Sequence, residues 1–192
     1  KATAFYIRVA PNQLKGGKYV RHALFTLRHG IIKRKIGKIQ NCAMRTKIHI
    51  LHPGKYMQCA TYLLEGSGGS VIIDPGAGFE EETVLENLSS TGVNTQDIKA
   101  MLLTHCHVDH AMGAGSLQAR FGWSLYTSAT ATELLRGQAP QIWGEHPERI
   151  PAIEVDYEFD DGEVIRPAGF PIQCVATPGH TAGSYSFVIE SA

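Results

Sequence analysis

The sequence predicts an α/β layered sandwich, and three observations support this prediction. Short apolar runs alternate with helical patterns between residues 47 and 136, and a series of strands follows from residue 153. Histidines stand directly after two of the predicted strands, where the edge of a sheet can hold a site. Mixed α/β order followed by late strands favours a layered sandwich over a Rossmann alternation.

The first part of the predicted domain consists of three strands and a helix. Strands are expected in the β-rich runs at 47–51, 59–64 and 70–73. The third strand ends in Asp74-Pro75-Gly76, which is a turn signal. A helix is expected at 80–88, because apolar residues recur there at helical spacing behind three glutamates that suit the helix dipole. This helix is predicted to cover one face of a sheet.

The remaining elements continue the alternation and then turn into strands only. Helices are expected at 111–121 and 130–136, and a loop over the site at 140–151. Further strands are expected at 98–103, 123–127, 153–159, 163–166, 172–176 and 185–189.

Charge is unevenly distributed along the chain. Residues 1–47 hold 12 of the 18 Lys and Arg, whereas residues 48–192 carry 6 basic and 18 acidic residues, a balance of −12. This split predicts a basic extension at 1–46, separate from a domain at 47–192. Three interpretations of the extension remain open: an arm for nucleic acid or membrane surfaces, a transit peptide, or sequence outside the working protein with Met44 as its initiator.

Composition indicates one ordinary globular domain in a reducing compartment. The chain is 43% hydrophobic, and its four cysteines form no CxxC pair of the kind found in zinc knuckles and redox dithiols. The sequence shows no secretory pattern and no run of about 18 apolar residues that could span a bilayer. We therefore expect a cytoplasmic protein that does not cross a membrane.

The motif that indicates chemistry is Thr-His-Cys-His-Val-Asp-His at residues 104–110. Three of the nine histidines fall within six residues, directly after a predicted strand. In extended backbone, His105 and His107 project to the same side and can bind one ion, while Cys106 points the other way. The following turn can direct Asp109 and His110 toward a second ion. Imidazole and carboxylate ligands suit zinc, with iron or manganese as alternatives.

Two further segments carry candidate site residues. Thr177-Pro178-Gly179-His180-Thr181 places His180 just past a strand, where it can supply the third nitrogen of a three-histidine site, with Thr181 supporting the site from outside the ligand set. Asp74 has two interpretations of similar weight. It is either an Asx-turn residue or a carboxylate that orients a metal ligand.

Together, the segments 73–76, 105–110 and 177–181 resemble the motifs of the metallo-β-lactamase superfamily, which includes glyoxalase II-like thioesterases, lactonases and some nucleases. The resemblance covers about residues 44–192. It implies a four-layer αβ/βα sandwich with metals at one edge, between two sheets. It also implies that a first zinc ion is held by His105, His107 and His180, and that Asp109 and His110 begin a second site.

The family pattern continues after the last predicted strand with a Gly-Asp, whose carboxylate bridges the metals, and with a later histidine. Neither has a counterpart before Ala192, so the second half of the sandwich is expected to be incomplete. We therefore interpret the chain as a fragment and expect weak or mononuclear metal binding and little activity. The complete protein is expected to hold two zinc ions.

The resemblance implies a hydrolase that acts on a small-molecule ester, thioester or lactone. Water activated by zinc would attack the substrate, and Asp109 would orient this water as the catalytic carboxylate. The −12 balance of residues 48–192 disfavours a nucleic-acid partner, because it repels phosphate. A nuclease, an iron-dependent oxygenase and an inactive metal-binding remnant are the alternatives.

Overall fold

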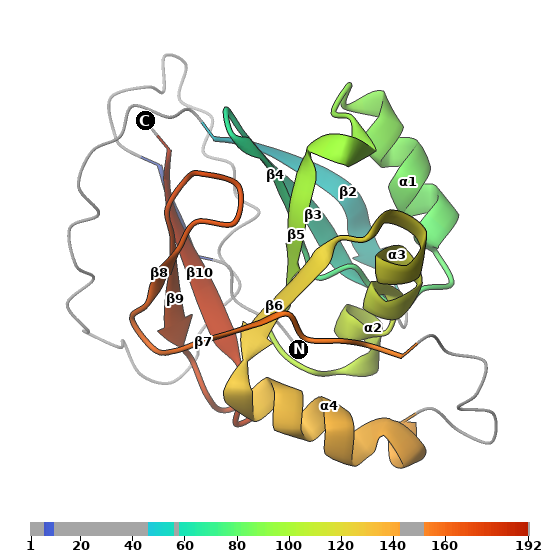
Figure 1. Ribbon diagram of the computed structural model, residues 1–192, viewed down its shortest axis with the longest axis vertical. Coiled ribbons are helices and arrows are strands. Elements are labelled where there is room, and N and C mark those ends of the chain that lie inside the picture. Colours follow the sequence, from blue (N-terminus) through green and yellow to red (C-terminus); the bar gives the residue numbers. More distant parts are fainter. Residues whose placement is uncertain (1–5, 10–45, 56–57, 143–151, 192) are drawn as a thin grey trace.

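Two β-sheets pack face to face, and helices cover the outer face of the larger sheet (Figure 1). The computed structural model describes residues 6–9, 46–55, 58–142 and 152–191. The larger sheet, in spatial order, consists of β2 (Lys47–Lys55), β3 (Gln58–Gly66), β4 (Gly69–Ile73), β5 (Ile98–Leu102), β6 (Ser124–Ser128) and β7 (Tyr157–Phe159). The smaller sheet consists of β1 (Tyr6–Val9), β10 (Tyr185–Ser191), β9 (Ile172–Ala176) and β8 (Val164–Ile165).

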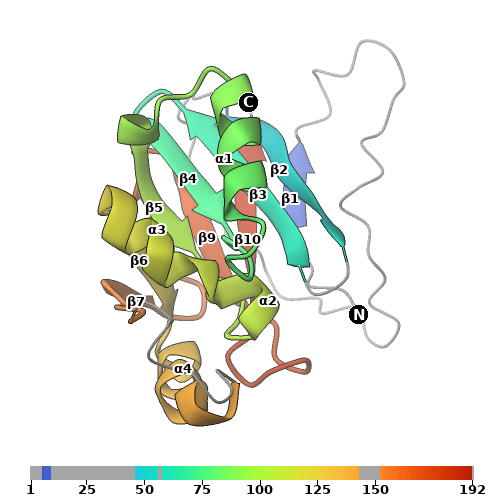
Figure 2. The same cartoon turned by 90° about the vertical axis from the view of Figure 1, so that its right-hand side faces the viewer.

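Most of the helices lie on the side of the larger sheet that faces away from β9 and β10, whereas the helix that follows β6 lies beyond the end of that strand (Figure 2). The helices are α1 (Glu81–Ser90), the single turn η2 (Thr95–Asp97), α2 (Val108–Ala111), α3 (Gly113–Phe121) and α4 (Ala129–Ile142). Within the described residues, no helix covers the outer face of the smaller sheet. The described residues therefore form a layer of helices, the larger sheet and the smaller sheet, in the order of the predicted αβ/βα sandwich.

Strand periodicity divides the core into two clusters of buried side chains. Neighbouring residues on a strand point to opposite faces of the sheet. On β3, Leu63 packs under the helices while Leu64 packs between the sheets, and on β5 Met101 and Leu102 divide in the same way. All four side chains are at most 1% exposed. The centre of the larger sheet is thus buried on both faces, which gives the loop after β5 a firm base.

The direction of the strands brings separate segments to one edge. Strands β4, β5 and β6 run parallel, with Ile73 opposite Leu102, so their carboxyl ends meet. The Asp74 amide donates to the carbonyl of Leu102 over 2.9 Å, which extends the pairing by one residue. The residues that follow β4 and β5 therefore lie side by side.

Three expectations from the sequence were wrong in detail. The single helix predicted at 111–121 is two helices, because Gly113 donates its amide to Gly76 O over 2.7 Å and is held against that turn. The helix predicted to end at Arg136 continues to Ile142, because residues that disfavour a helix in the sequence have less influence on its end than tertiary packing. The strand predicted from Ile153 begins only at Tyr157, because the Asp156 carboxylate, rather than a strand carbonyl, accepts from the Leu125 amide over 2.7 Å.

The predicted basic extension falls mostly outside the described residues, as does the predicted loop from residue 143 to 151. Its described part, β1, pairs in parallel with β10, with Ile7 opposite Ile189. The boundary between residues 46 and 47 stays a prediction. In the part of the chain that the structure describes, none of the helices has the length and apolar character needed to cross a bilayer.

Candidate metal centre

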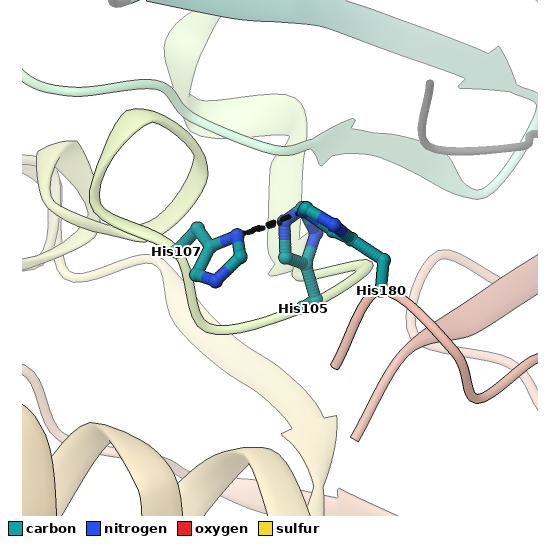
Figure 3. A group of neighbouring side chains, drawn as sticks. All are labelled: His105, His107 and His180. Carbon is teal, nitrogen blue, oxygen red and sulfur yellow. Dashed lines mark hydrogen bonds between the residues drawn. The ribbon is translucent and has the colours of Figure 1, made fainter. Parts of the chain in front are cut away.

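Three imidazole rings from two distant segments face one another at the edge of the sandwich (Figure 3). His105 and His107 lie in the loop between β5 and α2, and His180 lies in the loop between β9 and β10. His107 Nδ1 is 3.1 Å from His105 Nε2 and 2.8 Å from His180 Nε2. One nitrogen from each ring lies within 4.8 Å of the other two. The structure therefore brings together the three residues predicted to hold a first ion.

This arrangement of nitrogens fits a divalent metal better than a hydrogen-bond network. A ring nitrogen carries either one N–H or one lone pair, so it makes one good hydrogen bond. His107 Nδ1 nevertheless faces two other ring nitrogens. Three nitrogens bound to tetrahedral zinc at about 2 Å would lie about 3.3 Å apart, which is close to the two separations found here.

Burial keeps this site in the form that binds metal. Burial, aided by the charges of neighbouring histidines, lowers the pKa of His105 from 6.5 to about 2. The same causes, burial first, lower the pKa of His180. Both rings are therefore neutral at pH 7, and a neutral ring can offer its lone pair to a cation.

Asp74 lies beneath the histidines and is fully buried. Its carboxylate accepts hydrogen bonds from the Thr104 amide at 2.8 Å, the Thr104 hydroxyl at 2.7 Å and His110 Nδ1 at 2.8 Å. Its φ of 52° is left-handed, a region that Asp tolerates better than most residues. The Asp74 side chain therefore contacts Thr104 and His110, whereas the Gly76 amide donates to the His110 carbonyl instead of closing an Asx turn. That Asp74 orients a metal ligand stays a prediction.

The candidates for a second ion lie beside the first three rings. The ring centroids of His105 and His110 are 4.1 Å apart. Because His110 Nδ1 donates to Asp74, its Nε2 is left to face outward, 3.6 Å from Asp109 Oδ2. Burial opposes a charge on His110, but the charge and hydrogen bond of Asp74 outweigh it, so the pKa of His110 is raised. Asp109 is 44% exposed and is free to meet a ligand from solvent.

The loop that carries His180 is closed on itself. Thr181 shares a 2.8 Å hydrogen bond between its hydroxyl and that of Ser184, and its carbonyl accepts from Gly179 N over 3.2 Å. The loop also packs against α4, since a Cβ on Gly183 would lie 2.7 Å from Ala131 N. Among the described residues, Thr181 makes no hydrogen bond to a predicted ligand. Its contacts shape the turn that carries His180, and its support for a metal site stays a prediction.

The positions of two neighbours of the histidines, Thr104 and Cys106, can be compared with what the sequence predicted. Cys106 is 1% exposed and packs in the core under the helices, which confirms that it points away from His105 and His107. Thr104 was not singled out from the sequence, yet it bonds both Asp74 and His105, with its hydroxyl 3.1 Å from His105 Nδ1. Its place at the strand end, before the first histidine, was the available signal.

The geometry describes a histidine-lined candidate metal centre at the edge of a two-sheet αβ/βα sandwich. Residues 54–192 match the model of the metallo-beta-lactamase superfamily, and the chain belongs to that superfamily.

Several relatives and solved structures are similar to this chain. Hydroxyacylglutathione hydrolase GloC of Haemophilus influenzae is 27% identical over 147 residues, which cover 73% of this chain and 65% of that protein. The mitochondrial persulfide dioxygenase ETHE1 of Bos taurus is 30% identical over 136 residues, which cover 68% of this chain and 43% of that protein. The crystal structure of BJP-1, a subclass B3 metallo-beta-lactamase of Bradyrhizobium japonicum, has a TM-score of 0.58 at 27% identity, and the match covers 67% of this chain and 49% of that one.

The chain thus spans between 43% and 65% of the length of these three proteins. Their names state three different reactions. Membership of the superfamily therefore establishes the fold, whereas the reaction has to be argued from the site.

Proposed function

We propose that the chain carries the metal-binding half of a zinc-dependent hydrolase that acts on a small-molecule ester, thioester or lactone. The observation that carries this proposal is the convergence of one nitrogen from each of His105, His107 and His180 within 4.8 Å. Three histidines with an open fourth position are a ligand set of catalytic zinc, which supplies a bound water with a pKa of about 7.

The residues of the chain have distinct parts in this reaction. The three histidines would hold the metal, and the lowered pKa values of His105 and His180 mean that neither ring has to lose a proton before it binds. Asp109, whose carboxylate is partly exposed beside His110 Nε2, would accept a hydrogen bond from the attacking water and orient it. Asp74 would keep His110 turned toward the same space.

The substrate class is supported by the relatives and by charge. A hydroxyacylglutathione hydrolase is among the similar proteins, which favours a thioester or ester. A ribonuclease Z of Bradyrhizobium diazoefficiens is also similar, at 26% identity. The balance of −12 over residues 48–192 opposes a polyanionic substrate and favours the small-molecule alternative.

The first test is zinc binding by the chain, measured by competition with a chromophoric chelator. We expect about one zinc ion per chain, because the three histidines form the one cluster of metal-binding geometry among the described residues. His180→Ala should weaken zinc binding by about 100-fold or more, since this exposed loop residue can be removed without opening the core. His49→Ala is the matched control, because His49 contacts Glu65 rather than the cluster.

The outcomes separate the alternatives. Equal zinc affinity in the wild type and His180→Ala would overturn the proposed metal centre. Two tightly held ions per chain would contradict the expectation of mononuclear binding. Zinc binding followed by hydrolysis of thioester, ester or lactone probes, lost in His180→Ala but kept in His49→Ala, would support the hydrolase.

A second candidate function is an iron-dependent oxygenase. It is favoured by the similarity to a persulfide dioxygenase, which is 30% identical over 136 residues. Histidine and carboxylate ligands suit iron as well as zinc. Metal analysis of protein purified without added metal distinguishes the two, because iron as the main metal, together with oxygen consumption on a persulfide probe, would replace the hydrolase proposal.

A further inference from the structure

We propose that the Thr104 hydroxyl is a positioning group that holds His105 in its Nδ1–H tautomer and so directs the Nε2 lone pair at the metal. The inference deepens the proposed function and rests on it for the role of the metal. The tautomer itself is a property of the metal-free protein and can be tested separately.

Hydrogen bonds of its backbone hold Thr104 in place between two strands of the fold. Its amide donates to Asp74 Oδ1 over 2.8 Å, and its carbonyl accepts from the Tyr185 amide over 2.8 Å. The first contact joins Thr104 to the end of β4, and the second joins it to the start of β10 in the other sheet. Thr104 is fully buried. Its hydroxyl therefore has no access to solvent and has to use the partners that surround it.

Counting protons assigns the direction of each hydrogen bond. The hydroxyl has one hydrogen to donate and lone pairs to accept with. Asp74 Oδ2, 2.7 Å away, belongs to an acceptor-only carboxylate, so the hydroxyl donates there. The remaining contact, 3.1 Å to His105 Nδ1, can then be a hydrogen bond only if Nδ1 carries the proton and donates it to Thr104.

This assignment decides which nitrogen of His105 is available to a metal. With the proton on Nδ1, the Nε2 atom has its lone pair, and Nε2 is the atom that lies 3.1 Å from His107 Nδ1. The opposite tautomer would point a hydrogen into the triangle of nitrogens and would leave Nδ1 facing the hydroxyl without a hydrogen between them.

Asp74 prevents the hydroxyl from rotating toward His105 instead. Its Oδ2 atom accepts from the Thr104 hydroxyl and from His110 Nδ1, both within 2.8 Å. A rotation that turned the hydroxyl hydrogen to His105 would leave the fully buried carboxylate of Asp74 one donor short, which is unfavourable for a charged group without solvent access. One carboxylate thus orients His110 directly and His105 through Thr104.

The test compares three variants of the chain. Thr104→Val keeps the shape of the side chain but removes the hydroxyl, and Thr104→Ser keeps the hydroxyl. Thr127→Val is the matched control, because Thr127 is also fully buried but its hydroxyl has no hydrogen-bond partner. Two readouts are needed: the tautomer of His105 in the metal-free protein, from the nitrogen chemical shifts of the ring, and the dissociation constant for zinc.

We expect the Nδ1–H tautomer for His105 in the wild type, Thr104→Ser and Thr127→Val, and its loss in Thr104→Val. Zinc binding should weaken by about 10- to 100-fold in Thr104→Val and stay near wild type in the other two. A wild-type His105 with its proton on Nε2 would overturn the inference even if Thr104→Val does not fold. Unchanged tautomer and affinity in Thr104→Val would also overturn it. A wild type that binds no zinc would refute the proposed function, while the tautomer would still decide the role of Thr104.

Discussion

Replacing Asp74 with Asn should destabilise the metal-free protein, because Asp74 is the buried acceptor on which the site is built. Asn is nearly the same size as Asp and tolerates the left-handed φ of 52° found here, so backbone strain does not confuse the comparison. The carbonyl of Asn can still accept from the Thr104 amide, the partner of Oδ1. Its NH₂ group, however, replaces Oδ2 and meets two donors, the Thr104 hydroxyl and His110 Nδ1.

The size of the effect follows from these two lost contacts. A hydrogen bond to a charged group contributes about 1.5–3 kcal/mol, and a buried donor without a partner costs about 1–3 kcal/mol. The Thr104 hydroxyl can turn to accept from the new NH₂ group, which recovers part of this loss. We therefore expect a destabilisation of about 3 kcal/mol, or a decrease in Tm of about 6–12 °C for a domain of this size.

Thermal and urea denaturation of the metal-free protein measure this loss. Asp97→Asn is the control, since it removes one negative charge at an exposed position in η2. A ring-proton titration by NMR provides a second readout. The pKa of His110, which Asp74 raises, should fall in Asp74→Asn because the imidazolium loses its counter-charge. A Tm for Asp74→Asn close to that of Asp97→Asn, with the pKa of His110 unchanged, would refute the role given to Asp74.

Three further predictions concern pH, the core and the thiols. Below pH 6.5, His105 binds a proton in the unfolded chain but not in the folded protein, where its pKa is about 2. Acidification should therefore lower the free energy of unfolding through this residue by up to about 1.4 kcal/mol per pH unit. Urea denaturation at several pH values should give a free energy of unfolding that depends less steeply on pH in His105→Asn than in the wild type. Phe187→Ala should reduce the free energy of unfolding by about 3–5 kcal/mol, because Phe187 is 0% exposed between the sheets; a loss under about 1 kcal/mol would contradict the two-sheet core. In a Cys42→Ser background, the remaining cysteines are Cys59, Cys106 and Cys174, and burial raises the pKa of each thiol. The native protein should therefore resist thiol reagents until urea unfolds it. Prompt labelling of the native protein would contradict this prediction.

The sequence was a good guide wherever the relevant interactions are local. Apolar runs located β4, β5 and β9 to within one residue of their observed bounds, because β4 and β5 are buried on both faces and β9 turns every second side chain into the core at its start. It was a poorer guide at helix ends. The break at Met112 depends on the contact between Gly113 and Gly76, two residues that no local pattern relates.

The sequence alone determined that His105 and His107 stand together on one side of a strand end, because their spacing is set by the covalent backbone. Tertiary structure alone decided which other groups join them. His180 lies 73 residues after His107 in the sequence, and the two rings meet only because β9 packs across the larger sheet. Asp74 and Thr104 are 30 residues apart, and they meet because β4 and β5 are parallel neighbours whose ends coincide. Sequence spacing could not distinguish an Asx turn from a carboxylate that orients the site, since that distinction depends on which donors the folded chain places around it.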